Sequence, residues 1–353
     1  MKRYKPVNSL AWDDNNQEKY KYDWNEADCL LPDLISTNIS KFLSGNMSNW
    51  YPNINESKIN ELIANYNKCD SDQIMLTPGS DYAHEIILKY ISKNTMGRCL
   101  IIGPTYDNFR ASSESILNKT DILNFWMREN LLDGIVDENL DDFDLVYICS
   151  PNNPTGDLIP INILKKILNK YPKANILIDE AYIDFDLSSS VIELIKSHHN
   201  LIISRTFSKA WGLASFRVGY IVSNSTLISE LGAFGNIKHV NQFAKIALDV
   251  VLNNNHYMLN YVSLVNKNKS LLEALLKEKV PNLLEVTSKK GNFVLLRFKS
   301  NSAQKEFYQK CVQNSFYVRS LSHLSGFENF IRLTVPTGLG FERMKNIFNK
   351  ESI

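Results

Sequence analysis

The chain has little of the charge excess, apolar length or metal-ligand spacing that marks several protein classes. Of its 353 residues, 39 are Lys or Arg and 38 are Asp or Glu, so the formal net charge is only +1. This balance gives no support for a nucleic acid or a membrane surface as a partner. No apolar stretch approaches the ~18–20 residues that cross a bilayer. The polar, aromatic amino terminus contains no hydrophobic signal core. The six histidines are scattered, so we expect no metal site. Because neither a signal core nor a membrane-spanning stretch is found, we expect a cytoplasmic protein.

Closely spaced cysteine pairs are also missing. The cysteines are odd in number, lie far apart and form no C-x-x-C sequence; they are Cys29, Cys69, Cys99, Cys149 and Cys311. Cys99 and Cys149 lie inside apolar runs that are typical of buried strands. Reduced, packed thiols are therefore predicted, which favours a cytosolic setting.

The middle of the chain alternates short apolar runs with helical patterns. Helices are predicted around 107–118 and 161–170. The apolar runs are continuous rather than alternating, which indicates strands that are covered on both faces, as in a mostly parallel α/β sheet. The predicted strands are 99–102, 122–125, 145–149, 176–178, 201–203 and 218–222.

The two ends of the chain read differently from the middle. Residues 1–30 lack periodicity and are rich in aromatic side chains, so we expect an arm that packs against the body or a neighbouring subunit. Ser57 is predicted to cap the helix that follows it. From about Ile237 the pattern is helical, and two strands, 292–298 and 316–318, precede a last helix near Met344. We therefore predict an arm (1–30), a large α/β domain (31–245) and a smaller C-terminal α+β domain (246–353).

Polar and aromatic side chains follow four of the predicted strands. Ligands of open α/β sheets bind at the carboxyl ends of the strands, so these side chains are expected to converge. They comprise an aromatic ring, an amide, a carboxylate with a phenol, and a lysine with hydroxyls and a guanidinium. In chain order they are Tyr106, Asn153, Asp179 with Tyr182, and Thr206, Ser208 and Lys209 with Arg217 eight residues on.

Each of these residues has an ordinary structural explanation when it is taken alone. Lys209 could be a surface lysine, and Asp179 could simply end its strand at the surface. The sequence 153–156, Asn-Pro-Thr-Gly, makes a competent turn, and 79–81, Gly-Ser-Asp, makes a helix start. The joint interpretation is preferred because chance would have to place all of them at successive strand ends.

The ordered set of these strings resembles the fold-type I pyridoxal-phosphate enzymes of aminotransferase class I/II, and above all the histidinol-phosphate aminotransferase group. The resemblance runs in order from about residue 24 to 340. It comprises Tyr51-Pro52, Gly79-Ser80-Asp81, Asn153–Gly156, Asp179–Tyr182, Ser208-Lys209 with Arg217, and the late Arg319 and Arg332. The chain departs from the pattern of the group near Trp24–Asp28 and at Pro336. The resemblance implies that these positions contact the side chain of the substrate.

The resemblance implies pyridoxal 5′-phosphate as cofactor, with catalytic roles for three residues. Lys209 would bond the cofactor aldehyde and then move the substrate proton. Asp179 would keep the ring nitrogen protonated, so that the ring can accept electrons. Tyr182 and Asn153 would donate to the phenolic oxygen, and Tyr106 would stack on the ring.

The resemblance also implies anion-binding residues and a second subunit. The helix start at Ser80 and Asp81, with Ser208, Thr206 and Arg217, would hold the cofactor phosphate. Tyr51 would reach that phosphate from the neighbouring subunit of a homodimer. Arg332 and Arg319, with Asn153, would bind the substrate carboxylate or phosphate.

Three functions stay open at this point. The first is amino transfer between an amino acid or amino-phosphate, similar to histidinol phosphate, and a 2-oxo acid. The second is a lyase on the same scaffold, such as a decarboxylase of a phospho-amino acid. The third is a sensor that keeps the fold for binding only; the intact Lys209, Asp179 and Arg217 argue against it. The sequence leaves the identity of donor and acceptor undecided.

Overall fold

A computed structural model describes residues 20–45, 47–124 and 142–349 of the chain. The predictions for residues 1–19, and for the end of the strand at 122–125, fall outside these ranges. Within them, no helix is both long and apolar enough to cross a bilayer. All five cysteines are free thiols, as their spacing predicted, and Cys99 and Cys149 are buried, as their apolar runs predicted; Cys311 is buried as well.

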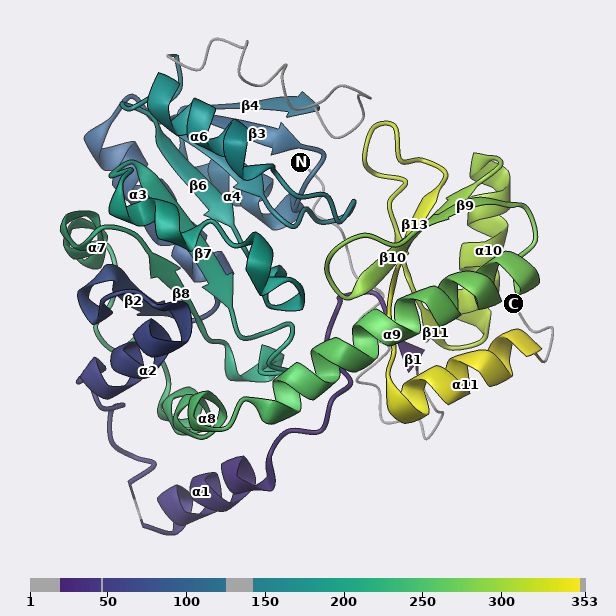
Figure 1. Cartoon of the computed structure of the whole chain (residues 1–353), viewed down its shortest axis with the longest axis horizontal. Helices are drawn as coiled ribbons and strands as arrows, with labels where there is room; N and C mark the ends of the chain where they lie inside the picture. Colours follow the sequence, from purple (N-terminus) through teal and green to yellow (C-terminus); the bar gives the residue numbers. More distant parts are fainter. Residues whose placement is uncertain (1–19, 46, 125–141, 350–353) are drawn as a thin grey trace.

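A seven-stranded sheet forms the larger part of the protein, with strand order β2-β8-β7-β6-β5-β3-β4 (Figure 1). The five strands from β7 to β4 are parallel, which confirms the predicted sheet type. β8 runs antiparallel to both β7 and β2. The bounds are β2 Ile74–Thr77, β3 Arg98–Gly103, β4 Lys119–Asn124, β5 Leu145–Cys149, β6 Asn175–Asp179, β7 Leu201–Thr206 and β8 Gly219–Val222.

Helices cover both faces of this sheet, which explains the continuous apolar strands. Successive side chains of a strand point to opposite faces. Ile101 and Tyr147 accordingly pack in one core with α3 (Ser80–Asn94) and α4 (Asp107–Ile116). Ile102 and Ile148 pack in the other core with α2 (Ser57–Asn67) and α6 (Ile161–Lys170). α7 (Ser225–Gly232) adds to the first core, and α8 (Gln242–Asn253) adds to the second.

Two details of the sequence interpretation need correction. Ser57 is the first residue of α2 rather than its cap; the N-cap position is Glu56, and the Ser57 hydroxyl donates to Asn55 Oδ1 at 2.8 Å. The four-residue strand β2 was not predicted, because Leu76 and Thr77 were assigned to the turn before α3. Both corrections concern short segments, in which periodicity has little room to show.

A four-stranded antiparallel sheet, with order β12-β13-β10-β9, forms the second part of the fold. The amino-terminal segment crosses to it, since β1 (Tyr20–Lys21) pairs in parallel with β11 (Phe316–Tyr317). The remaining bounds are β9 Leu283–Thr287, β10 Phe293–Phe298, β12 Arg319–Ser320, β13 Phe330–Thr334, α1 Asp33–Ser44, α9 His256–Lys279, α10 Asn301–Gln313 and α11 Gly338–Asn349. Short 3₁₀ turns lie at Ser71–Gln73, Ile183–Phe185, Leu187–Ser189, Ile192–Lys196 and Ala214–Phe216.

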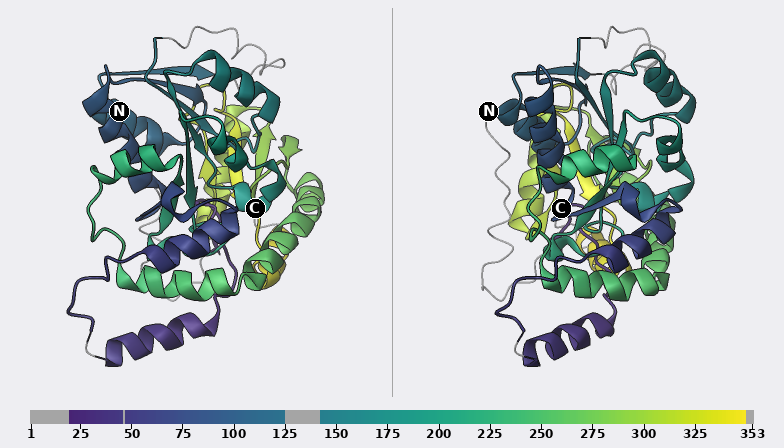
Figure 2. Two further views of the ribbon diagram at one scale, coloured as in Figure 1. Left: turned by 60° about the vertical axis from the view of Figure 1, so that its left-hand side comes forward. Right: turned by 90° about the vertical axis from the view of Figure 1, so that its left-hand side faces the viewer.

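The described part of the aromatic arm ties the two sheets together. After β1, the carbonyl of Tyr22 accepts hydrogen bonds from the backbone and side chain of Thr334 on β13. The chain then continues past the large sheet into α1. Figures 1 and 2 show α1 set apart from the body, on the side where α8 lies.

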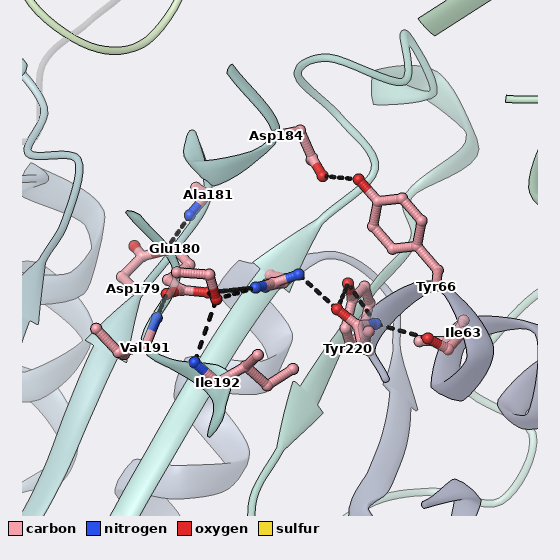
Figure 3. A network of polar contacts seen from close by, with 12 residues as sticks. Ile63, Tyr66, Asp179, Glu180, Ala181, Asp184, Val191, Ile192 and Tyr220 are labelled. Atoms are coloured by element: carbon pink, nitrogen blue, oxygen red, sulfur yellow. Dashed lines mark hydrogen bonds and ion pairs between the residues drawn. The ribbon is translucent and has the colours of Figure 1, made fainter. Parts of the chain in front are cut away.

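A buried ion pair joins the ends of β6 and β7 (Figure 3). Arg205 on β7 donates to Glu180, just after β6, through Nε at 2.8 Å and Nη2 at 2.6 Å. The same guanidinium donates to Asn67 on α2 and to Ser190. Burial by itself would lower the pKa of Arg205, but Glu180, Tyr220 and Asp184 together outweigh burial and raise it. The guanidinium therefore stays protonated inside the protein.

We predict that Arg205→Met strongly destabilises the fold, because it leaves the Glu180 carboxylate buried without its cation. The expected loss is about 3–5 kcal/mol of unfolding free energy, measured by urea unfolding of the cofactor-free protein with tryptophan fluorescence. Arg98→Met is the control. Arg98 lies 3.8 Å from Asp142 and from Asp144 at a partly exposed edge, where such pairs contribute about 0–1 kcal/mol. Equal losses for both variants would contradict the assignment.

Candidate active site

The side chains predicted to converge come from the carboxyl ends of adjacent strands. Lys209 follows β7, and its Nζ donates to the backbone carbonyl of Trp24 at 2.7 Å. The same Nζ lies 5.7 Å from the centre of the Tyr182 ring, which follows β6. Burial, and after it the charge of Arg332, lowers the pKa of Lys209 to about 8. The amine is therefore far easier to deprotonate than an ordinary lysine.

Asp179 is the last residue of β6 and is only 2% exposed. Its Oδ2 accepts from the Tyr147 hydroxyl at 2.8 Å, and its Oδ1 accepts from the backbone N–H of Ala181 at 3.1 Å. His84 Nε2 lies 3.6 Å from Oδ2. The carboxylate is thus held in one orientation inside the protein, rather than lying at the surface as the ordinary interpretation allowed.

Tyr182 and Asn25 form a second fixed pair. The Asn25 side-chain amide donates to the Tyr182 hydroxyl at 2.9 Å, and burial raises the pKa of Tyr182 to about 12. The phenol therefore stays protonated and can donate its own hydrogen to an acceptor. Asn25 adopts a left-handed backbone conformation, with φ of 55°, which asparagine tolerates better than most residues.

Arg332 on β13 reaches across from the small sheet to the large one. Its guanidinium donates to the Asn153 side-chain oxygen and to the backbone carbonyl of Asp23, and the residue is 6% exposed. Its charge acts on Lys209 and also on Tyr182. Arg332 and Asn153 therefore lie together beside the lysine, as the strand-end argument predicted for Asn153.

The start of α3 forms a cradle of donors with Arg217. Gly79, the N-cap residue, has φ of +84°, and a Cβ there would lie 2.8 Å from the Arg217 guanidinium. Because glycine has no side chain to cap the helix, the first N–H groups of α3 can serve an anion. Arg217 itself has φ of 52°, a strained conformation that is common at functional sites. Its Nη2 lies 3.8 Å from the Asp81 carboxylate.

Neighbouring predicted residues lie around this cradle. The Tyr106 hydroxyl donates to Asp81 at 3.1 Å, and burial raises the pKa of Tyr106 well above its usual value. The hydroxyl of Thr206 accepts from the backbone N–H of Ser208 at 3.1 Å, and both residues are buried. Ser80 is the first residue of α3. The predicted phosphate-binding residues thus lie between the end of β7 and the start of α3.

Two predicted residues lie elsewhere. Tyr51 is 79% exposed, with Lys238 Nζ 4.0 Å from its ring centre. Arg319 lies on β12, and its Nη2 is 3.5 Å from Asp107 at the start of α4. Asp107 also accepts from His323 at 2.6 Å. Arg319 nevertheless pairs in register with Arg332 across β12 and β13.

Four contributors were not predicted as site residues. Asn25 and the carbonyl of Trp24 come from the arm, where the sequence shows no pattern. Tyr147 is one of several apolar or aromatic residues within β5, and His84 lies on the apolar stripe of α3. The available signal was a polar group, either an imidazole or a tyrosine hydroxyl, inside an otherwise apolar element. Buried polar groups need partners, so such a group indicates a polar contact.

Comparison with known proteins identifies the family. Residues 16–349 match the family model described as aminotransferase class I and II. The chain is 33% identical to the dihydroxyacetone phosphate transaminase of Campylobacter jejuni, over 91% of this chain and 87% of that one. It is 31% identical to the histidinol-phosphate aminotransferase of Aeromonas salmonicida, over 83% and 82%. The crystal structure of the histidinol-phosphate aminotransferase from Clostridium acetobutylicum superposes with a TM-score of 0.83 at 25% identity, covering 94% and 99%.

The chain therefore belongs to the class I and II aminotransferases, and its cofactor is pyridoxal 5′-phosphate. The donor set described above fits this group. The glycine-opened helix start with Arg217 suits a phosphate, and the lysine of lowered pKa suits an aldehyde. The buried carboxylate suits a protonated ring nitrogen.

We predict that Arg332→Gln raises the pKa of Lys209 above its value of about 8, because one of the two leading causes of the lowering is removed. The measurement is an NMR titration of ¹³C-labelled lysines in the cofactor-free protein. Lys269 is the internal control. Burial and the charge of Lys290 lower its pKa to about 8, and Arg332 is not among the causes of that shift. A Lys209 pKa that stays in place, or a Lys269 pKa that moves equally, would contradict this account.

Proposed function

We propose that this aminotransferase moves an amino group between a phosphate-bearing amine and a 2-oxo acid. Bound pyridoxal phosphate supplies an electrophilic carbon and a ring that takes up the electron pair left when the substrate Cα loses its proton. Lys209 would bond that carbon in the resting enzyme and would carry the proton of the substrate Cα. An amine with a pKa of about 8 suits this task, because a useful fraction is neutral near physiological pH.

The other roles are assigned to the side chains that the fold fixes in place. Asp179 would hold a proton on the ring nitrogen, and Tyr182 and Asn153 would bind the phenolic oxygen of the ring. Tyr106 would pack on the ring face. The phosphate would be bound by Ser208, Thr206, Arg217 and the start of α3 at Ser80 and Asp81. The burial of Asp179 and the donor cradle at Gly79 support these assignments.

The pairing of Arg319 with Arg332 is the observation that carries the choice of substrate. The two residues are direct partners on antiparallel strands β12 and β13. Like charges placed directly opposite each other on a sheet repel. Asp107 lies 3.5 Å from Arg319 and offsets part of its charge. A substrate anion beside Arg332 would relieve the repulsion that remains, and a guanidinium matches carboxylate and phosphate equally well. One site can therefore serve the phosphate of the amine and the carboxylate of the 2-oxo acid in turn.

The names of two relatives support a phosphate ester as one substrate. One is a transaminase of dihydroxyacetone phosphate, and another is an aminotransferase of histidinol phosphate. Both of these compounds carry a phosphate group and no carboxylate. We propose the same substrate class for this chain.

We also propose a homodimer, with Tyr51 completing the phosphate site of the partner chain. Large apolar side chains are exposed on and after α1, which Figure 2 shows apart from the body. A cavity of about 440 Å³ lies beside α1 and is lined by Ile39, Leu43, Phe216 and Phe243 among others. Exposed apolar surface of this kind marks interfaces. The exposed apolar residues are Leu34, Leu43, Met47, Trp50, Tyr51 and Ile54. A cytoplasmic location stays a prediction from the sequence.

We predict that the wild-type cofactor converts to pyridoxamine phosphate with histidinol phosphate or with the amine of dihydroxyacetone phosphate, but poorly with the same amines without phosphate. Arg332→Ala is expected to raise the Michaelis constant of the phosphorylated amine about tenfold to a hundredfold, with little change in cofactor affinity. Stopped-flow absorbance of single half-reactions measures both, and Lys209→Ala is the inactive control.

Two results would contradict the substrate proposal. One is equal efficiency with phosphorylated and unphosphorylated amines. The other is carbon dioxide release from a phospho-amino acid without any need for a 2-oxo acid, which would favour the lyase.

We predict that mixing inactive Lys209→Ala and Tyr51→Ala chains restores activity. If Tyr51 serves the partner site, one site of each mixed dimer contains both wild-type side chains. About a quarter of the wild-type activity is expected when the two chains pair at random, measured after unfolding and refolding them together. Mixing Lys209→Ala with Arg217→Ala is the matched comparison. This mixture restores a site only if Arg217 and Lys209 of one site come from different chains. We assign both residues to the same chain and therefore expect no recovery. No recovery in the Tyr51 mixture would show that Tyr51 does not serve the site of the partner chain.

A further inference from the structure

His84 lies buried directly behind Asp179, and none of the roles proposed above uses it. It is 1% exposed and lies one helical turn after Ser80 on α3. Its Nε2 is 3.0 Å from the hydroxyl of Ser204 on β7 and 3.6 Å from Oδ2 of Asp179 on β6. Ser204 and Asp179 are register partners in the sheet. His84 thus contacts both strands that carry the site.

The approach to Asp179 bears on which ring nitrogen of His84 carries hydrogen. The Ser204 hydroxyl can donate to Nε2 or accept from it, whereas a carboxylate oxygen only accepts, so a favourable contact with Asp179 requires a hydrogen on Nε2. Nδ1 points the other way and has no hydrogen-bond partner among the described residues. Leaving a buried polar atom unpaired is unfavourable, so the histidine is a poor choice for packing alone. Its benefit must come from Nε2.

The surroundings of His84 hold the ring in place. It meets Phe109 and Tyr147 edge to face, with ring centres 5.2 and 5.8 Å apart. Phe109 and Tyr147 are themselves stacked at 3.6 Å. Tyr147 donates to the same Oδ2 of Asp179 at 2.8 Å. Two side chains from different elements therefore lie against one carboxylate oxygen: Tyr147 donates to it, and His84 Nε2 lies 3.6 Å from it.

We propose that His84 is a positioning residue that holds the Asp179 carboxylate oriented towards the ring nitrogen of the cofactor. Partial positive charge beside Oδ2 stabilises the anion, which in turn stabilises a proton on the ring nitrogen. The proposal rests on the role proposed for Asp179. It adds a residue from α3, the helix whose first turn is assigned to the cofactor phosphate, so that one helix serves both ends of the cofactor.

The test compares binding of pyridoxal phosphate with binding of its 1-deaza analogue, in which carbon replaces the ring nitrogen. Dissociation constants are measured by fluorescence titration of the cofactor-free protein. Wild type is expected to prefer pyridoxal phosphate. His84→Leu removes the donor at similar volume, and the preference should fall about tenfold or more, as for a lost hydrogen bond to a charged group. His84→Gln, which can place an amide N–H near the position of Nε2, should retain most of the preference.

Controls separate positioning from packing. Ile87→Ala removes buried apolar volume from the same helix; it should lower the melting temperature and leave the preference unchanged. Ser204→Ala removes a single oxygen and should weaken the preference by a smaller factor than His84→Leu, which keeps the test informative if His84→Leu folds poorly. A preference unchanged in His84→Leu and Ser204→Ala, but lost in Asp179→Asn, would overturn the role of His84 alone. A preference unchanged in Asp179→Asn would overturn both assignments.

Discussion

The ion pair of Arg205 with Glu180 is the constraint on which the site depends. Glu180 follows Asp179 directly, and Arg205 lies four residues before Lys209, so the pair fixes the ends of the two strands that carry the acid and the amine. Its other partners, Asn67 on α2 and Ser190, extend the network to the helix layer (Figure 3). A buried pair contributes little net stability by itself, but breaking it is costly. Its value here lies in fixing geometry.

Positive charge is concentrated around this frame. Arg332 comes close enough to Lys209 to lower its pKa, and Arg319 lies opposite Arg332 on the neighbouring strand. Arg217 stands at the start of α3, where the helix dipole adds further positive potential. Such an arrangement favours a doubly anionic cofactor. Burial, and after it the charge of Arg332, makes Lys209 a base near neutral pH.

Much of the fold was predictable because its signals are local. Strand β5 and helix α6 begin and end where their apolar patterns do, and the continuous apolar strands indicated a sheet covered on both faces. The polar residues at the strand ends could be named for the same reason, since a parallel sheet gathers its carboxyl ends at one edge. Ser57 and β2 were misassigned because one residue or one short turn offers too few positions for a pattern. Asn25, Tyr147 and His84 escaped because each acts through a partner more than thirty residues away.

The sequence by itself determined the class of chemistry. It contains an ordered series of strand-end residues that includes one lysine, one carboxylate and one guanidinium. Each of these could be recognised from its position after a predicted strand. Only the tertiary structure decided their electrostatic state. Burial and Arg332 set the pKa of Lys209, and both arise from segments distant in the chain. The same holds for the orientation of Asp179, which hydrogen bonds from Tyr147 and Ala181 fix together. The electric field and the solvation at a side chain depend on its neighbours in space, whereas a sequence pattern records only separations along the chain.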